Sequence, residues 1–443
     1  VTYIVSIEMS NYLFPSLIKN ILVARSGPDM DMMDKKAGRA MDRTFDRAAT
    51  EKLLSELVRI PSPYFEEKEI MGFAREWLEG CGVPAEFHHF HEKKIYDYRG
   101  INVIGTLEGC LPGPKVVLNG HLDTVKLCSG WTREPFGAPI EGNRMFGLGA
   151  CDMKSGCAAI MLALQEFVKD ASPFRGSIHY SLVCDEEGPF GLGTDALILD
   201  GKIPPDADVA LITEPSSAFA DVGFPSICLG ARGGWNYSVR VRGRSAHGAQ
   251  PEKGINAVSE AAKILLELEK SELKPHEKLG PGSICCVEFH GGGAALSVPD
   301  EAFFNIFRHV VVGETRETVI REAEEAVRRA CIKGKADISF RVAPHEECDG
   351  FPAYVTPEDH EMVRQMVSSI REATGRKPAF SYFSSVGDFC YTGGRLGIPT
   401  LVVGPKGGNF HAADEYVELD TVVATAGIVY RFLCRMAGRV GGE

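Results

Sequence analysis

Apolar residues recur along the chain in two patterns, one typical of buried strands and the other of amphipathic helices. The run at 116–118 is short, apolar and largely β-branched, which is typical of a strand buried on both faces. Similar runs at 177–184 and 209–213 predict two further strands. Apolar residues spaced three and four apart predict helices over 66–79 and 158–168. Strands and helices that alternate in this way predict an α/β fold with one main sheet.

The chain before this sheet gives weaker signals. Thr50 has the side chain of an N-cap and predicts a helix that ends before Pro61. Residues 1–44 contain only a weak apolar stretch, too short to cross a bilayer, and no cleavage site of a signal peptide. We expect residues 1–44 to be a poorly ordered extension, or to lie upstream of the true start of the protein.

The order of the predicted elements changes after residue 232. The pattern there predicts strand, helix, strand, strand, helix and strand over 235–243, 256–270, 282–290, 302–311, 315–333 and 336–342. This split βαβ order is typical of ferredoxin-like α+β units, which can fold by themselves. We therefore expect an insertion over 232–343 that interrupts a main domain formed by residues 45–231 and 344–443.

Composition excludes several kinds of partner. The net charge is −12 and no long run of lysine or arginine offsets it, so we expect no nucleic-acid partner and no membrane partner. The 13 cysteines are scattered, odd in number and free of paired Cys-x-x-Cys spacings. They are typical of reduced thiols, which predicts a cytoplasmic protein.

Histidine and acidic residues stand where the predicted strands end. His121 and Asp123 lie two residues apart after the first strand, so their side chains point the same way. The carboxyl ends of strands are the usual position of ligand sites in open α/β sheets. Most His-x-Asp pairs are satisfied core or loop residues, so the acids further along the chain decide the interpretation.

Those later candidates each follow an apolar run. They are Asp152, Glu187, Glu214 and His411. With His121 they supply two imidazoles and three carboxylates, which suits two zinc-like ions that share one carboxylate and leave a position for water. Any one of these acids could instead be solvated or cap the next helix. The adjacent Glu186 and Glu187 argue for the metal site, because burying both is costly unless cations compensate.

A glycine-rich turn at 147–156 opens a helix and invites comparison with phosphate-binding loops. It lacks the third glycine of the dinucleotide fingerprint and the Gly-Lys-Ser/Thr of a P-loop. We therefore do not expect a nucleotide-dependent enzyme.

Taken together, the motifs resemble those of a known enzyme family. They are Gly-His-Leu-Asp-Thr-Val at 120–125, the turn at 147–156, Asp-Glu-Glu-Gly at 185–188, Thr-Glu-Pro-Ser at 213–216 and the loop ending in His411. From about residue 50 onward the chain resembles the co-catalytic zinc amidohydrolases and peptidases, which include acetylornithine deacetylase, succinyl-diaminopimelate desuccinylase, aminoacylase-1 and glutamate carboxypeptidases. The resemblance implies a mixed-sheet, zinc-exopeptidase-like catalytic domain with an inserted ferredoxin-like lid that also dimerises.

The resemblance implies how two divalent metal ions would be held. Asp152 would bridge the two ions. His121 and Glu214 would complete the ligands of one ion, and Glu187 and His411 those of the other. Zinc is the expected metal, with cobalt or manganese as alternatives.

It also implies three catalytic roles and a backbone feature. Asp123 would orient His121, and Glu186 would be the general base that moves a proton from water to the leaving nitrogen. His247, in the Ser-Ala-His-Gly stretch of the insertion, would stabilise the oxyanion, often across a dimer interface. A cis peptide bond would join Asp152 and Met153.

The function implied is hydrolysis of an amide bond in a small N-acyl amino acid, by a homodimer formed through the lid. An exopeptidase acting on a short peptide is the first alternative, because the same chemistry serves both. A non-catalytic metal-binding protein on the same fold is the second, although the intact Glu186 argues against it.

Substrate recognition stays open, because the insertion departs from the family pattern. Leu296 precedes Ser297-Val298-Pro299 where many members have asparagine. Phe307-Arg308-His309 stands where they have Asp-x-Arg. Neighbouring residues on a strand face opposite ways, so Arg308 cannot be assumed to replace an arginine that binds the substrate carboxylate. Asp388, further on, either lies near the substrate or caps a turn.

Overall fold

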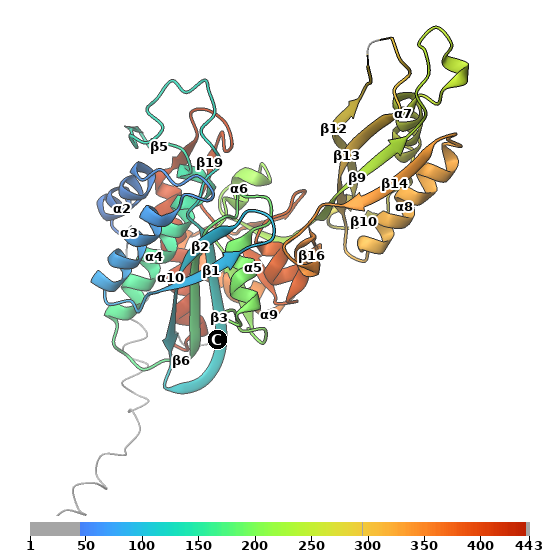
Figure 1. Cartoon of the computed structure of the whole chain (residues 1–443). Helices are drawn as coiled ribbons and strands as arrows, with labels where there is room; N and C mark the ends of the chain where they lie inside the picture. Colours follow the sequence, from blue (N-terminus) through green and yellow to red (C-terminus); the bar gives the residue numbers. More distant parts are fainter. Residues whose placement is uncertain (1–44, 295, 440–443) are drawn as a thin grey trace, which may run out of the picture.

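The computed structural model describes residues 45–294 and 296–439, so the prediction for residues 1–44 lies outside the described residues. Figure 1 shows two lobes: a main part built on a large sheet, and the insertion beside it in yellow to orange. Among the described residues, no helix is long and apolar enough to cross a membrane.

Nine strands form the main sheet within these described residues, in the order β1-β2-β6-β3-β7-β18-β8-β16, with β17 also paired to β8. Their bounds are β1 Glu86–Glu92, β2 Tyr98–Glu108, β3 Leu111–His121, β6 Arg175–Val183, β7 Val209–Ile212, β8 Ser226–Ala231, β16 Tyr354–Val355, β17 Ala379–Phe383 and β18 Thr400–Val402. β6, β3, β7 and β18 are parallel neighbours, whereas β1, β2 and β16 pair antiparallel. The sheet is mixed, which confirms the expected fold class.

Both faces of the second half of β3 are buried, as the apolar run at 116–118 predicts. Val116 and Leu118 belong to the large core, to which the helices α2, α3, α4, α9 and α10 contribute. Val117 points the other way, into a smaller core that includes Leu197 of α5. The helices are α2 Arg47–Arg59, α3 Lys68–Gly80, α4 Ser155–Lys169, α5 Leu192–Leu199, α6 Ser216–Phe219, α9 Glu361–Thr374 and α10 Leu419–Met436.

The start of the first described helix differs from the prediction. Asp46, not Thr50, is the N-cap of α2, and its carboxylate accepts hydrogen bonds from the N–H groups of Ala48 and Ala49 at 3.2 Å. Thr50 lies one turn inside the helix, where its hydroxyl donates to the Asp46 carbonyl at 3.0 Å. Aspartate and threonine can both cap a helix, so the apolar pattern alone does not distinguish them, and the prediction of Thr50 was wrong.

The insertion forms an antiparallel sheet in the order β12-β13-β9-β14, with β15 also paired to β9. Its elements are β9 Gly233–Arg242, α7 Ala257–Leu268, β12 Ser283–Gly291, β13 Glu301–Val310, α8 Arg316–Arg329, β14 Lys335–Phe340 and β15 Gly350–Phe351. The strand order is that of a ferredoxin-like unit. Its core, drawn from 235–340, shares no residue with the large core, which supports the domain boundaries that we propose at 232 and 343.

A further small sheet holds the loop that carries His411. It pairs β19 Gly407–Gly408 with β20 Tyr416–Glu418, and then β5 Arg144–Phe146 with β4 Ile140–Glu141. His411 lies between β19 and β20, while β5 leads directly into the glycine-rich turn. The small sheet therefore places two segments that are far apart in sequence beside each other.

Candidate metal centre

The candidate residues meet at one edge of the main sheet. His121 ends β3, Glu186 and Glu187 follow β6, and Glu214 follows β7. Because these three strands are parallel neighbours, their carboxyl ends lie side by side. Asp152 comes from the turn over Ala150–Lys154, and His411 from the loop between β19 and β20.

Asp152 lies between the two histidines. Its Oδ1 atom is 3.4 Å from Nε2 of His121, and its Oδ2 atom is 3.4 Å from Nε2 of His411. Glu214 Oε1 lies 3.4 Å from Nε2 of His121, and Glu187 Oε1 lies 2.9 Å from Nε2 of His411. One carboxylate thus separates two sets of donor atoms, each with one imidazole and one further acid.

Glu186 lies beside these groups and makes a different contact. Its Oε2 atom is 3.8 Å from Nε2 of His121, and its Oε1 atom accepts the N–H of Asp388 at 3.2 Å. Asp388 is buried beneath it, and Thr194 donates its hydroxyl to the Asp388 carboxylate at 2.5 Å. Asp388 therefore supports Glu186 through its backbone.

The donor set fits divalent cations. Nε2 of His121 and Oε2 of Glu214 are both buried without a hydrogen-bond partner among the described residues. An unpaired buried polar atom is costly, and metal coordination would satisfy both atoms. Ligand atoms of His121, Asp152 and Glu187 lie within 4.8 Å of one another, as do those of His121, Glu186 and Glu214. Histidine and carboxylate donors at this spacing suit zinc-like ions.

Burial of these acids changes their proton affinity. Burial, with the nearby charge of Asp152, raises the pKa of Glu214 to about 8. Burial also raises the pKa of Glu186 well above its usual range. Hydrogen bonds to Asp152 and Glu187 raise the pKa of His411 to about 11. Protons or cations must therefore balance the acids of this cluster.

Asp123 contacts both His121 and the loop that carries the two glutamates. Nδ1 of His121 pairs with the backbone carbonyl of Asp123 at 3.1 Å, while the nearer Asp123 carboxylate oxygen is 3.6 Å away. The carboxylate instead accepts the N–H groups of Glu186 at 3.2 Å and Glu187 at 2.9 Å. Its side chain therefore positions the loop that carries both glutamates.

The sequence analysis missed two residues that support Asp152. The buried carboxylate of Glu415 accepts the N–H groups of Gly149, Cys151 and Asp152 at 2.8–3.0 Å. The buried ammonium of Lys154 donates to the carbonyls of Leu57 and Ile60, at the end of α2. Neither Glu415 nor Lys154 follows an apolar run in the sequence. The acidic side chain of Glu415 is the one signal that could have suggested its role. The peptide bond from Asp152 to Met153 is cis, as the resemblance implied.

The structure does not bring His247 to this cluster within one chain. His247 lies in the insertion, where its Nδ1 atom accepts the N–H of Ala249 at 3.1 Å. Leu296 nearby is 82% exposed. Arg308 is fully buried in the insertion and pairs with Glu314 at 2.8 Å and Glu322 at 3.1 Å, so it faces away from the cluster.

A cavity of about 310 Å³ opens beside the cluster. Residues from both halves of the main part line it: Asp152, Glu186, Glu187, Glu214, Phe219, Phe383, Ser384, Ser385, Val386, Phe389, Phe410 and His411. Four carboxylates and a histidine therefore adjoin an aromatic wall.

Comparison with known proteins agrees with this geometry. The model of peptidase family M20/M25/M40 matches residues 117–435. A succinyl-diaminopimelate desuccinylase of Methylocella silvestris is 30% identical over 387 residues, covering 85% of this chain and 95% of the relative. One of Wolinella succinogenes is 27% identical over 380 residues, covering 84% and 96%.

Solved structures show the same fold. The aminopeptidase PepT of Bacillus cereus superposes with a TM-score of 0.71 at 21% identity, covering 89% of this chain and 99% of that one. The YXEP protein of Bacillus subtilis, described as a dinuclear metal-binding peptidase, gives 0.63 at 14% identity, covering 89% and 100%.

Proposed function

Because the chain belongs to peptidase family M20/M25/M40, we propose that it is a metal-dependent hydrolase that removes the acyl group from a small N-acyl amino acid. The observation that carries this proposal is the carboxylate of Asp152 between two histidines, with Glu186 beside it. The relatives named desuccinylases, which the chain covers almost completely, support an N-acyl substrate. The peptidases among the solved structures are too distant in sequence to favour exopeptidase action.

We propose that Asp152 bridges two divalent ions. His121 and Glu214 would hold one ion, and Glu187 and His411 the other, in keeping with the distances around Asp152. Zinc suits these nitrogen and oxygen donors, and cobalt or manganese could replace it. Such ions, when bound, polarise a carbonyl group and acidify water.

Glu186 is the proposed general base. Its carboxylate adjoins the cluster, and the backbone of Asp388 fixes one of its oxygens. The other oxygen is free to take a proton from water and pass it to the leaving nitrogen. Asp123 is the positioning residue for this loop.

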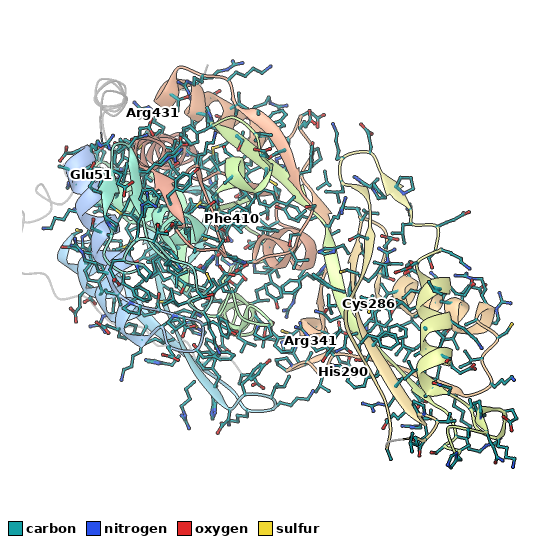
Figure 2. All side chains as sticks on the ribbon, turned by 90° about the horizontal axis from the view of Figure 1, so that it is seen from above. Glu51, Cys286, His290, Arg341, Phe410 and Arg431 are labelled. Carbon is teal, nitrogen blue, oxygen red and sulfur yellow. The ribbon has the colours of Figure 1, made fainter. Side chains whose placement is uncertain are left out.

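We further propose a homodimer formed through the insertion. β12 pairs only with β13 among the described strands and exposes Val287 and Phe289, by 57% and 37%. Figure 2 shows Cys286 and His290 of this strand in the smaller lobe. An exposed apolar edge strand is a ready surface for a second copy. In such a dimer, His247 would stabilise the oxyanion at the metal centre of the other copy. Separately, the scattered cysteine thiols favour a cytoplasmic location.

The experiment is an activity assay of purified protein after chelation and after zinc, cobalt or manganese is added back. We expect hydrolysis of N-acetyl and N-succinyl amino acids to disappear with the chelator and to return with the metal. Hydrolysis of dipeptides alone, or activity that resists chelation, would contradict the proposal.

A further inference from the structure

The aromatic wall of the cavity is built from four phenylalanines in contact. The ring centroids of Phe219 and Phe410 are 4.8 Å apart, and those of Phe219 and Phe383 are 5.3 Å apart. Phe389 extends the row at 5.4 Å from Phe383. Phe383 and Phe389 are buried in the main part, whereas Phe410, labelled in Figure 2, is 36% exposed. Part of an apolar surface therefore faces the cavity and is not covered by the protein itself.

The insertion adds a fifth ring next to this wall. A Cβ atom at Gly234 would lie 2.6 Å from the Phe307 ring and 3.4 Å from Cγ1 of Val386. Glycine at 234 thus allows Phe307 of the insertion and Val386 of the cavity wall to approach each other closely. Arg308, the next residue, points to the opposite face and is paired there.

Among the described residues, the cavity offers no lysine or arginine that would form an ion pair with an acidic side chain of a substrate. The four carboxylates of the cavity balance the charge of two divalent ions, so no positive charge is left over. A second carboxylate placed here would be desolvated without a partner, which is costly. An apolar cavity of about 150 Å³ already accepts a benzene ring, so this space can hold one beside the reacting amide.

The wall lies beside Glu186, the proposed proton donor to the leaving nitrogen. Glu186, which would give its proton to that nitrogen, touches the segment that follows Phe383. A Cβ atom at Gly387 would lie 3.0 Å from Oε1 of Glu186 and 2.7 Å from the Phe389 ring. The part of the substrate nearest Glu186 is the amino acid, so its side chain is the group that meets the wall.

We propose that this cavity is the specificity pocket for the amino-acid side chain, and that it selects an aromatic or large apolar side chain over an acidic one. This inference rests on the proposed function and names its substrate class: N-acyl derivatives of apolar amino acids. Phe410 and Phe219 are the residues that determine the selection.

The test compares kcat/KM for N-acetyl-L-phenylalanine, N-acetyl-L-aspartate and N-acetyl-L-alanine on the zinc-loaded enzyme. We expect the phenylalanine derivative to exceed the aspartate derivative at least tenfold. Phe410→Ala should lower the phenylalanine-to-alanine ratio about tenfold, mainly through KM. The matched control is Phe380→Ala, because Phe380 is also 36% exposed but does not line the cavity. It should leave that ratio unchanged.

Equal or better hydrolysis of the aspartate derivative, or an unchanged ratio in Phe410→Ala, would overturn the pocket assignment. Failure to hydrolyse all three substrates and the corresponding N-succinyl derivatives would instead contradict the proposed function. In that case the pocket can still be tested by calorimetry, which measures how tightly the Glu186→Gln variant binds the phenylalanine and aspartate derivatives. Tighter binding of the phenylalanine derivative supports the pocket, and equal binding rejects it.

Discussion

Two buried clusters of charged side chains in this molecule are composed in opposite ways. In the insertion, the fully buried Arg308 pairs with Glu314 and Glu322, so the cluster contains its own cation. In the metal centre, acids surround His121 and His411, and no lysine or arginine pairs with them among the described residues. The first cluster is complete as it stands, whereas the second has an excess of negative charge.

The difference shows what distinguishes a structural cluster from a binding site. A buried ion pair satisfies its own charges, and removal of one partner leaves the others uncompensated. A buried group of acids without a cation must hold protons or bind metal ions. Burial, together with the neighbouring acids, raises the pKa values of Glu186 and Glu214.

The largest effect is expected for Glu186→Gln, which separates the catalytic role of the metal centre from its ability to bind metal ions. This change removes the proposed base but none of the proposed ligands, so we expect kcat to fall by about 10³-fold while metal content stays the same. The control is Glu134→Gln, at an exposed glutamate. Activity within tenfold of the parent protein would contradict the assigned role.

Arg308→Met should leave the insertion cluster with an excess of negative charge, as in the metal centre. Loss of the cation leaves Glu314 and Glu322 buried and unpaired, which we expect to cost about 3–5 kcal/mol in the free energy of unfolding. Urea unfolding measures this loss. Changing both glutamates to glutamine in the same variant should restore part of it, and a loss below about 1 kcal/mol would refute the comparison.

Divalent ions should stabilise the metal centre only. At a zinc concentration about 100 times the dissociation constant, one site adds about 2.7 kcal/mol of stability. For a chain of this length, we therefore expect Tm to rise by about 3 °C for each occupied site when zinc is added to chelated protein. His121→Ala should lose most of this rise, whereas Arg308→Met should retain it. An equal rise in all three proteins would point to non-specific binding.

The smallest expected effect concerns His309, beside the insertion cluster. Burial, with the charges of Arg232 and Arg308, lowers the pKa of His309 to about 4 from an ordinary value of 6.5. Between these pH values the unfolded chain binds more protons, so stability falls as pH drops. We expect a loss of about 1–2 kcal/mol from pH 7 to pH 4, reduced from the full linkage value for partial exposure.

His309→Gln removes the titrating group and should unfold with a smaller dependence on pH. Urea titrations of both proteins at several pH values measure the difference. Identical pH dependence in the two proteins would show that His309 keeps its ordinary pKa in the folded state.

The sequence predicted the strands that end at the site better than the details within the site. The apolar runs that end at His121, Glu186 and Glu214 identify buried parallel strands, and parallel strands bring their ends together. Asp152 and His411 do not follow from periodicity alone. Each follows an apolar run, but a small sheet that joins distant segments is what brings them close to the strand ends.

Contacts between backbone and side chain could not be predicted in the same way. Glu415 holds the turn around Asp152, and the carboxylate of Asp123 also accepts the N–H groups of the glutamate loop. Both depend on where a loop passes in three dimensions, and neither leaves a spacing in the sequence. The N-cap at Asp46 was missed for a similar reason, because several nearby polar residues can cap a helix.

The most direct test of the account is a crystal structure of the zinc-loaded protein with anomalous diffraction from the metal. The account predicts two zinc peaks per chain, one beside each oxygen of Asp152 at about 2.0–2.2 Å. One peak should also contact His121 and the other His411. A chain that is fully active but shows no peak at Asp152, or one whose only zinc lies elsewhere, would contradict it.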